Sequence, residues 1–116
     1  MISIKDIPVF KMLLGKVYDP TLIEIISTVE SFFPGIIITE GYRKDAGVHS
    51  TDPVRGIDLR SRNYTAEQTQ TMKDFINKAW IYDPKRPAMK CCIVHDVGRG
   101  IHFHVQTHPR TARRIV

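Results

Sequence analysis

The stretch from residue 20 to residue 33 restricts the fold of this chain more than any other. Apolar side chains recur there at the spacing of one helix face, namely Leu22, Ile25, Ile26, Val29, Phe32 and Phe33. Asp19-Pro20 has the residue types that begin a helix, and Pro34-Gly35 ends the run. The sequence therefore predicts an amphipathic helix here, and it is the clearest one in the chain.

Shorter elements are predicted on either side of this helix. Residues 7–14 favour a short helix that ends at Gly15. The run 35–42, GIIITEGY, is rich in β-branched side chains and predicts a buried strand. Residues 44–55 combine Gly, Pro, Ser and Asp and predict a loop, after which GIDLRS predicts a short strand.

The C-terminal half predicts one further helix and a hairpin. Thr65 and Gln68 have the spacing of a capping box, so a helix should follow Thr65 and end near residues 82–84. The segment MKCCIVHDVGRGIHFHVQTH reads as two strands joined at residues 96–100. The order helix, strand, strand, helix, hairpin predicts an α+β fold, with a small antiparallel sheet and flanking helices.

The length of 116 residues and the hydrophobic fraction of 42% fit a single domain over residues 1–116 that folds without disulfides. Cys91 and Cys92 are adjacent and would point to opposite faces of a strand, so we expect free thiols, as in a chain made in a reducing cytoplasm. The N-terminus lacks a signal-peptide pattern, and no apolar run approaches the roughly 20 residues of a membrane span. We therefore expect no stable membrane insertion.

The net charge of +5 is compatible with an anionic partner, such as nucleic acid or an acidic bacterial cell-wall polymer, and equally with a plain solvated surface. Interleaved aromatic residues and a recognition helix are not evident in the sequence. We therefore expect no nucleic-acid partner.

Histidines and one aspartate stand where ordinary core or loop residues are expected. In the run IHFHV, His102 and His104 would share one strand face. His49 lies in the predicted loop, and Asp58 lies between Ile57 and Leu59 in a predicted strand. Taken singly, each has an ordinary explanation. His49 can be a simple loop histidine, Asp58 a carboxylate paired with an arginine, and the two strand histidines part of a polar sheet face. Together, His49, Asp58 and His104 form a nitrogen, nitrogen, oxygen set that suits zinc, with His102 beside it as a proton acceptor.

These residues also carry a family resemblance. The run EGYRKDAGVHSTDPVRGIDLRS, followed by GRGIHFHVQ, resembles the zinc peptidases that cut peptidoglycan peptides. That family comprises D-alanyl-D-alanine carboxypeptidases, dipeptidases and L-alanyl-D-glutamate endopeptidases, including many phage endolysins. The hedgehog signalling domain shares their fold. The resemblance covers roughly residues 36 to 106 and implies a fold of the hedgehog and DD-peptidase type.

The resemblance implies a role for each matching residue. His49, Asp58 and His104 would be the ligands of a Zn²⁺ ion. Arg43, at the end of the GYR run, would hold a substrate carboxylate or the oxyanion of the tetrahedral intermediate. His102 falls where one branch of the family has its catalytic histidine.

Two departures from the family pattern leave alternatives open. His49 and Asp58 enclose eight residues, two more than is commonest, which indicates an insertion around Asp52-Pro53 and makes Asp52 an alternative oxygen ligand. The family's Glu-x-x-His version of the catalytic base is absent, because position 101 is Ile. The base is then His102, or else Asp96 or His95 at the hairpin.

The sequence thus predicts a monomeric zinc peptidase that hydrolyses stem peptides or cross-links of bacterial peptidoglycan. It would be made in the cytoplasm without a signal peptide and act at the cell wall after a phage-type release. The alternative is a metal-binding module of the same fold without hydrolytic activity, such as a virion structural or wall-binding protein. The bond that is cut, the endopeptidase or carboxypeptidase mode and the oligomeric state do not follow from these residues.

Overall fold

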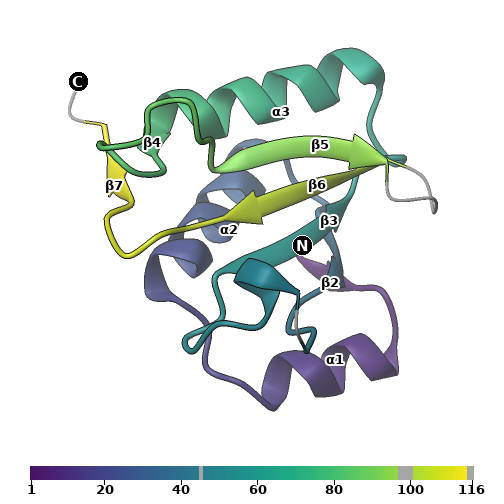
Figure 1. Ribbon diagram of the computed structural model, residues 1–116. Coiled ribbons are helices and arrows are strands. Elements are labelled where there is room, and N and C mark those ends of the chain that lie inside the picture. The colour runs from purple at the N-terminus through teal and green to yellow at the C-terminus, as the bar shows by residue number, and fades with distance from the viewer. Residues whose placement is uncertain (45, 97–100, 115–116) are drawn as a thin grey trace.

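A five-stranded sheet lies at the centre of the computed structural model, which describes residues 1–44, 46–96 and 101–114 (Figure 1). The strand order is β1-β2-β3-β6-β5. The strands are β1 (Ser3–Ile4), β2 (Ile37–Glu40), β3 (Gly56–Arg60), β5 (Cys92–Asp96) and β6 (Ile101–Gln106). The α+β class predicted from the sequence is therefore confirmed.

The sheet is mixed, so the prediction of an antiparallel sheet was wrong in one respect. β1 pairs with β2 in parallel, whereas the other neighbours are antiparallel. The chain between β1 and β2 contains two helices, which provide the crossover that a parallel pair requires. A strand as short as Ser3–Ile4 gives no alternation pattern, which is why the sequence did not indicate it.

Three helices begin where the sequence predicted. They are α1 (Ile7–Leu14), α2 (Pro20–Phe32) and α3 (Ala66–Ala79). The side chains of Asp6 and Asp19 accept hydrogen bonds from helix N–H groups, and Thr65 with Gln68 forms the complete capping box. No helix in the described part of the chain is long and apolar enough to cross a membrane.

α3 ends at Ala79 rather than near residues 82–84 as predicted. The chain leaves it as a short strand, β4 (Trp80–Ile81), which pairs with β7 (Ala112–Arg113) in a separate two-stranded sheet. Trp80 is only 2% exposed, and the Arg113 guanidinium lies 5.3 Å from its ring centroid. Pairing with a distant segment thus replaces the last predicted turn of the helix.

The core lies between one face of the sheet and the pair α2 and α3. In Figure 1, α2 lies behind the sheet and α3 runs above β5. It contains Leu22, Ile25 and Val29 from α2, Met72 and Ile76 from α3, and Ile57, Leu59, Phe103 and Val105 from β3 and β6. Because side chains alternate along a strand, the residues between these apolar ones face away from the two helices. They include Asp58, His102 and His104.

Cys91 and Cys92 are both buried free thiols, as predicted. Burial raises the pKa of each thiol to about 12, because the thiolate would lose its hydration there. Both therefore stay protonated at neutral pH and contribute to packing.

Candidate metal centre

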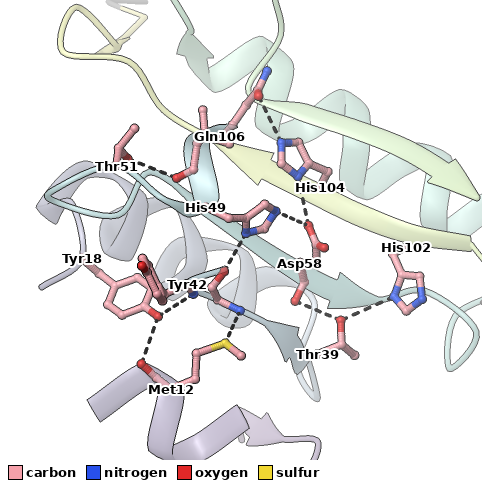
Figure 2. A network of polar contacts seen from close by, with 12 residues as sticks. Met12, Tyr18, Thr39, Tyr42, His49, Thr51, Asp58, His102, His104 and Gln106 are labelled. Atoms are coloured by element: carbon pink, nitrogen blue, oxygen red, sulfur yellow. Dashed lines mark hydrogen bonds and ion pairs between the residues drawn. The ribbon is translucent and has the colours of Figure 1, made fainter. Parts of the chain in front are cut away.

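The three predicted metal ligands meet on the sheet face that points away from α2 and α3 (Figure 2). His49 comes from the short 3₁₀ helix η1 (Gly47–His49), Asp58 from β3 and His104 from β6. Each residue offers one ligand atom, and these atoms all lie within 4.8 Å of one another. Residues far apart in the sequence therefore form one compact group, called the His-Asp-His trio below.

Local structure explains why the trio converges. The antiparallel register of β3 and β6 places Asp58 directly opposite His104. The η1 turn is held against this pair because Arg55 N donates to Val48 O at 2.9 Å and Arg43 N donates to His49 O at 3.0 Å. Gly56 permits the close approach, since a Cβ atom there would lie 2.7 Å from Val48 Cγ2.

The outer ring nitrogen of His49 is fixed by a main-chain carbonyl. His49 Nδ1 donates a hydrogen bond to Gly41 O at 2.7 Å, and a carbonyl oxygen can only accept. The proton of the neutral ring is therefore on Nδ1, which leaves Nε2 bare. Nε2 is buried, lies 3.3 Å from Asp58 Oδ1 and has no hydrogen-bond partner among the described residues.

His104 is fixed in the same way by a side-chain amide. His104 Nε2 lies 3.1 Å from Gln106 Oε1, while the Gln106 amide nitrogen donates to Lys90 O at 2.8 Å. That second bond turns the amide so that its oxygen accepts from His104. The other ring nitrogen, Nδ1, then faces Asp58 Oδ1 at 3.0 Å without a proton when the ring is neutral.

The pKa of Asp58 reflects this environment. Burial by itself would raise the pKa, but two effects outweigh it once a proton lies on the inner nitrogens of the His104 and His49 rings, namely the hydrogen bonds that these rings then donate and their positive charge. Together they hold the pKa of Asp58 below its usual range. The carboxylate is thus ionised at neutral pH, as a metal ligand has to be.

The trio as a whole has the properties of a cation site. Two bare imidazole nitrogens and one carboxylate oxygen converge, and their lone pairs repel unless a proton or a metal ion lies between them. Histidine ligands of metals typically donate their other ring N–H to a carbonyl or carboxylate, as His49 and His104 do to Gly41 and Gln106. The residues present therefore can hold a metal ion.

His102 and Arg43, the two predicted catalytic residues, lie outside the trio. His102 shares the sheet face with His104, but its Nδ1 is 3.4 Å from Thr39 Oγ1 and the ring turns toward β2 (Figure 2). The Arg43 side chain is exposed and makes no hydrogen bond or ion pair within the described ranges. Their catalytic roles stay predictions.

His95 lies closer to the trio than its position in the sequence suggests. In β5 it is directly opposite His102, yet its ring leans toward His104, with 5.6 Å between the two ring centroids. Its Nε2 is buried and has no hydrogen-bond partner in the described part of the chain. Among the histidines outside the trio, His95 thus has a free nitrogen near a candidate ligand.

Two alternatives from the sequence remain, Asp52 as an oxygen ligand and Asp96 as a catalytic base. Asp52 is exposed and is not part of the trio, so the alternative oxygen ligand is not supported. Asp96 ends β5 opposite Ile101, but its side chain and residues 97–100 lie outside the described residues.

Sequence reasoning missed the two groups that orient the ligand histidines. Gln106 is two residues after His104 on the same strand face, and that spacing could have indicated it. The Gly41 carbonyl left no signal, because a main-chain oxygen is independent of residue type.

Comparison with known proteins finds no matching family model, curated protein or solved structure. The hedgehog-like fold and the peptidoglycan peptidase family therefore stay predictions from the sequence.

Proposed function

We propose that the protein is a zinc-dependent peptidase that hydrolyses peptide bonds in bacterial peptidoglycan. The observation that supports this most strongly is the trio, in which one ligand atom each of His49, Asp58 and His104 lies within 4.8 Å of the others. Catalytic zinc sites typically have three protein ligands and leave one position for water or substrate. The peptidoglycan substrate comes from the sequence resemblance.

The residues of the trio have distinct tasks in this proposal. A zinc ion held there would supply Lewis acidity toward a water molecule and a scissile carbonyl group. Asp58 stays ionised and offsets the positive charge. The Gly41 carbonyl and Gln106 keep the outer protons on His49 and His104, so the inner nitrogens remain available.

Proton transfer requires an acceptor within hydrogen-bond reach of the reacting water. His95 and His102 are the candidates on this sheet face. His95 has its Nε2 free near His104, whereas His102 Nδ1 contacts Thr39. The main-chain N–H of Arg43 donates to His49 O, and its exposed guanidinium would hold a substrate carboxylate or stabilise an oxyanion.

The expected surroundings of the enzyme follow from the same proposal. A chain with a net charge of +5 would be attracted to the anionic polymers of a cell wall. We propose that the protein acts there as a monomer, after a phage-type release.

One observation favours a second function, a metal-binding module without hydrolytic activity. His102 contacts Thr39 instead of turning toward the trio. A protein that retains the ligands and lacks a positioned base would bind the metal for structural reasons, as a virion or wall-binding component.

Metal analysis combined with a cell-wall turbidity assay separates these functions. The peptidase predicts about one zinc per chain and lysis that a chelator abolishes. His95→Ala and His102→Ala should each keep the zinc, and the variant that loses lysis identifies the proton acceptor. Zinc without lysis by the wild-type protein would favour the binding module, and absence of zinc would contradict both.

A further inference from the structure

A basic groove lies between α3 and the edge strand β5. These two elements are at the far end of the molecule from α1 (Figure 1). Its volume is about 790 Å³. Four cationic side chains line it, from Lys73, Lys78, Lys90 and Arg114, against the single carboxylate of Asp74. This carboxylate accepts a hydrogen bond from Gln70, and within the described ranges none of the four cations forms an ion pair.

The edge of β5 presents main-chain groups to this groove. Gln106 N donates to Cys91 O at 2.8 Å, so Cys91 is a residue whose main-chain groups point toward β6. Along an antiparallel strand, such residues alternate with residues whose main-chain groups point outward. The N–H and C=O of the next residue, Cys92, therefore point away from β6, and so do those of Val94. The groove is lined by both residues.

Asn77 of α3 already occupies the position of a neighbouring strand at Cys92. Its side-chain amide donates to Cys92 O at 2.9 Å and accepts from Cys92 N at 2.9 Å. At Val94 the described residues provide no such partner, so the outward N–H and C=O remain available. A strand edge of this kind is a template for pairing with another extended segment.

We infer that this groove binds an acidic peptide in extended conformation, as an additional strand next to β5. The main-chain groups of Val94 would pair with the peptide backbone, and the four cations would bind its carboxylates. A nucleic acid or another polyanion would contact the cations but would leave Val94 unpaired, which is why the observations favour a peptide.

The groove is connected to the trio through one side chain. Gln106 holds His104 with its amide oxygen and donates to the carbonyl of Lys90, a residue that lines the groove. Binding in the groove does not require hydrolysis, so the inference goes beyond the proposed peptidase activity and is independent of it.

Direct binding tests the inference. A labelled peptide of alternating glutamate and valine is titrated with the chelator-treated protein, and fluorescence anisotropy reports the affinity. The double variant Lys73→Glu with Lys78→Glu should bind at least about tenfold more weakly, because like charges then face each other. Lys5→Glu with Lys11→Glu reverses the charge of two exposed lysines on or beside α1 and should change the affinity less than about twofold.

The peptide itself tests the strand pairing without altering the protein. N-methylation of alternate backbone amides blocks hydrogen bonding on one side of an extended peptide. One methylation register should weaken binding by roughly tenfold, and the other should bind like the unmodified peptide. Absence of binding would overturn the inference, as would equal effects of both registers or equal binding of duplex DNA. Self-association that the peptide cannot displace, measured by light scattering, would assign the edge to a second copy and also overturn it.

Discussion

Two buried carboxylates of this protein, Asp83 and Asp58, differ in how their negative charge is balanced. Asp83 is fully buried and accepts hydrogen bonds from Arg110, at 2.9 and 2.7 Å, and from Arg86 at 2.9 Å. Asp58 is 8% exposed and faces the rings of His49 and His104. A guanidinium carries a permanent charge, whereas an imidazole that donates its only proton elsewhere does not. The charge of Asp83 is therefore balanced by two guanidinium groups, whereas Asp58 faces no permanent positive charge in the described part of the chain and can hold a cation.

The buried ion pairs of Asp83 should contribute most to stability. We expect Asp83→Asn to lower Tm by roughly 15 °C in metal-free buffer, because two guanidinium groups lose their anionic partner. The matched change Asp58→Asn should lower Tm by less than half as much. It removes a negative charge whose oxygen lone pairs face the lone pairs of the His49 and His104 ring nitrogens in the metal-free protein. Circular dichroism during heating measures both, and an equal or larger loss for Asp58→Asn would contradict the comparison.

Acid should affect the two carboxylates in the same direction. Hydrogen bonds from Arg110 outweigh burial at Asp83, and those around Asp58 do likewise, so both pKa values lie below the usual range. Their ionised forms therefore stabilise the fold above the ordinary carboxyl pKa of about 4, and this stability is lost as the pH falls below it. In denaturant unfolding of the metal-free protein, Asp83→Asn should flatten this acid dependence more than Asp58→Asn. A wild-type curve as flat as that of Asp83→Asn would contradict the assignment.

Zinc should act on only one of the two sites. At a concentration about a hundredfold above Kd, zinc should raise the Tm of the wild-type protein by roughly 10 °C, because it binds the folded state. Asp58→Asn should abolish this rise, and Asp83→Asn should keep it from a lower starting temperature. Differential scanning calorimetry with and without chelator provides the measurement. A zinc effect that survives Asp58→Asn would locate the ion elsewhere.

The smallest expected effect concerns the orientation of His104. Gln106→Leu should weaken zinc binding by roughly tenfold while the fold is retained, because the ring loses the acceptor that fixes its outer proton. A competitive chelator titration gives the affinity. Gln70→Leu is the matched control, since Gln70 is exposed on α3 and bonds Asp74 away from the trio. Equal affinities for Gln106→Leu and the wild-type protein would mean that Gln106 does not orient the ligand.

Elements that depend on local signals could be predicted closely from the sequence. The caps at Asp6, Asp19 and Thr65 satisfy N–H groups within their own helices, so nearby residues determine where these helices begin. The end of α3 was misplaced because Trp80 pairs with Arg113, which is distant in the sequence. The parallel strand β1 was missed because its two residues give no alternation pattern.

The candidate site likewise contains features that local sequence indicates and features that depend on the assembled sheet. His49, Asp58 and His104 could be proposed as a set because strand alternation marks Asp58 and His104, while residue type and the family resemblance mark His49. The lean of His95 toward His104 and the bond from His104 to Gln106 depend on the register of β5 and β6 and on side-chain rotamers. Those features arise only when the sheet is assembled, so no pattern within one segment indicates them.

If the trio binds a metal ion as proposed, the missing side chain at Gly56 has a consequence for ion-size selectivity. A methyl group there would meet Val48 Cγ2 at 2.7 Å and the His49 main-chain nitrogen at 3.3 Å. The turn that carries His49 would then have to move away from β3, and the triangle of ligand atoms would widen. A hydrogen atom at position 56 thus keeps the triangle narrow, which matches ions with short ligand bonds, of about 2 Å as for zinc, over larger ones such as calcium.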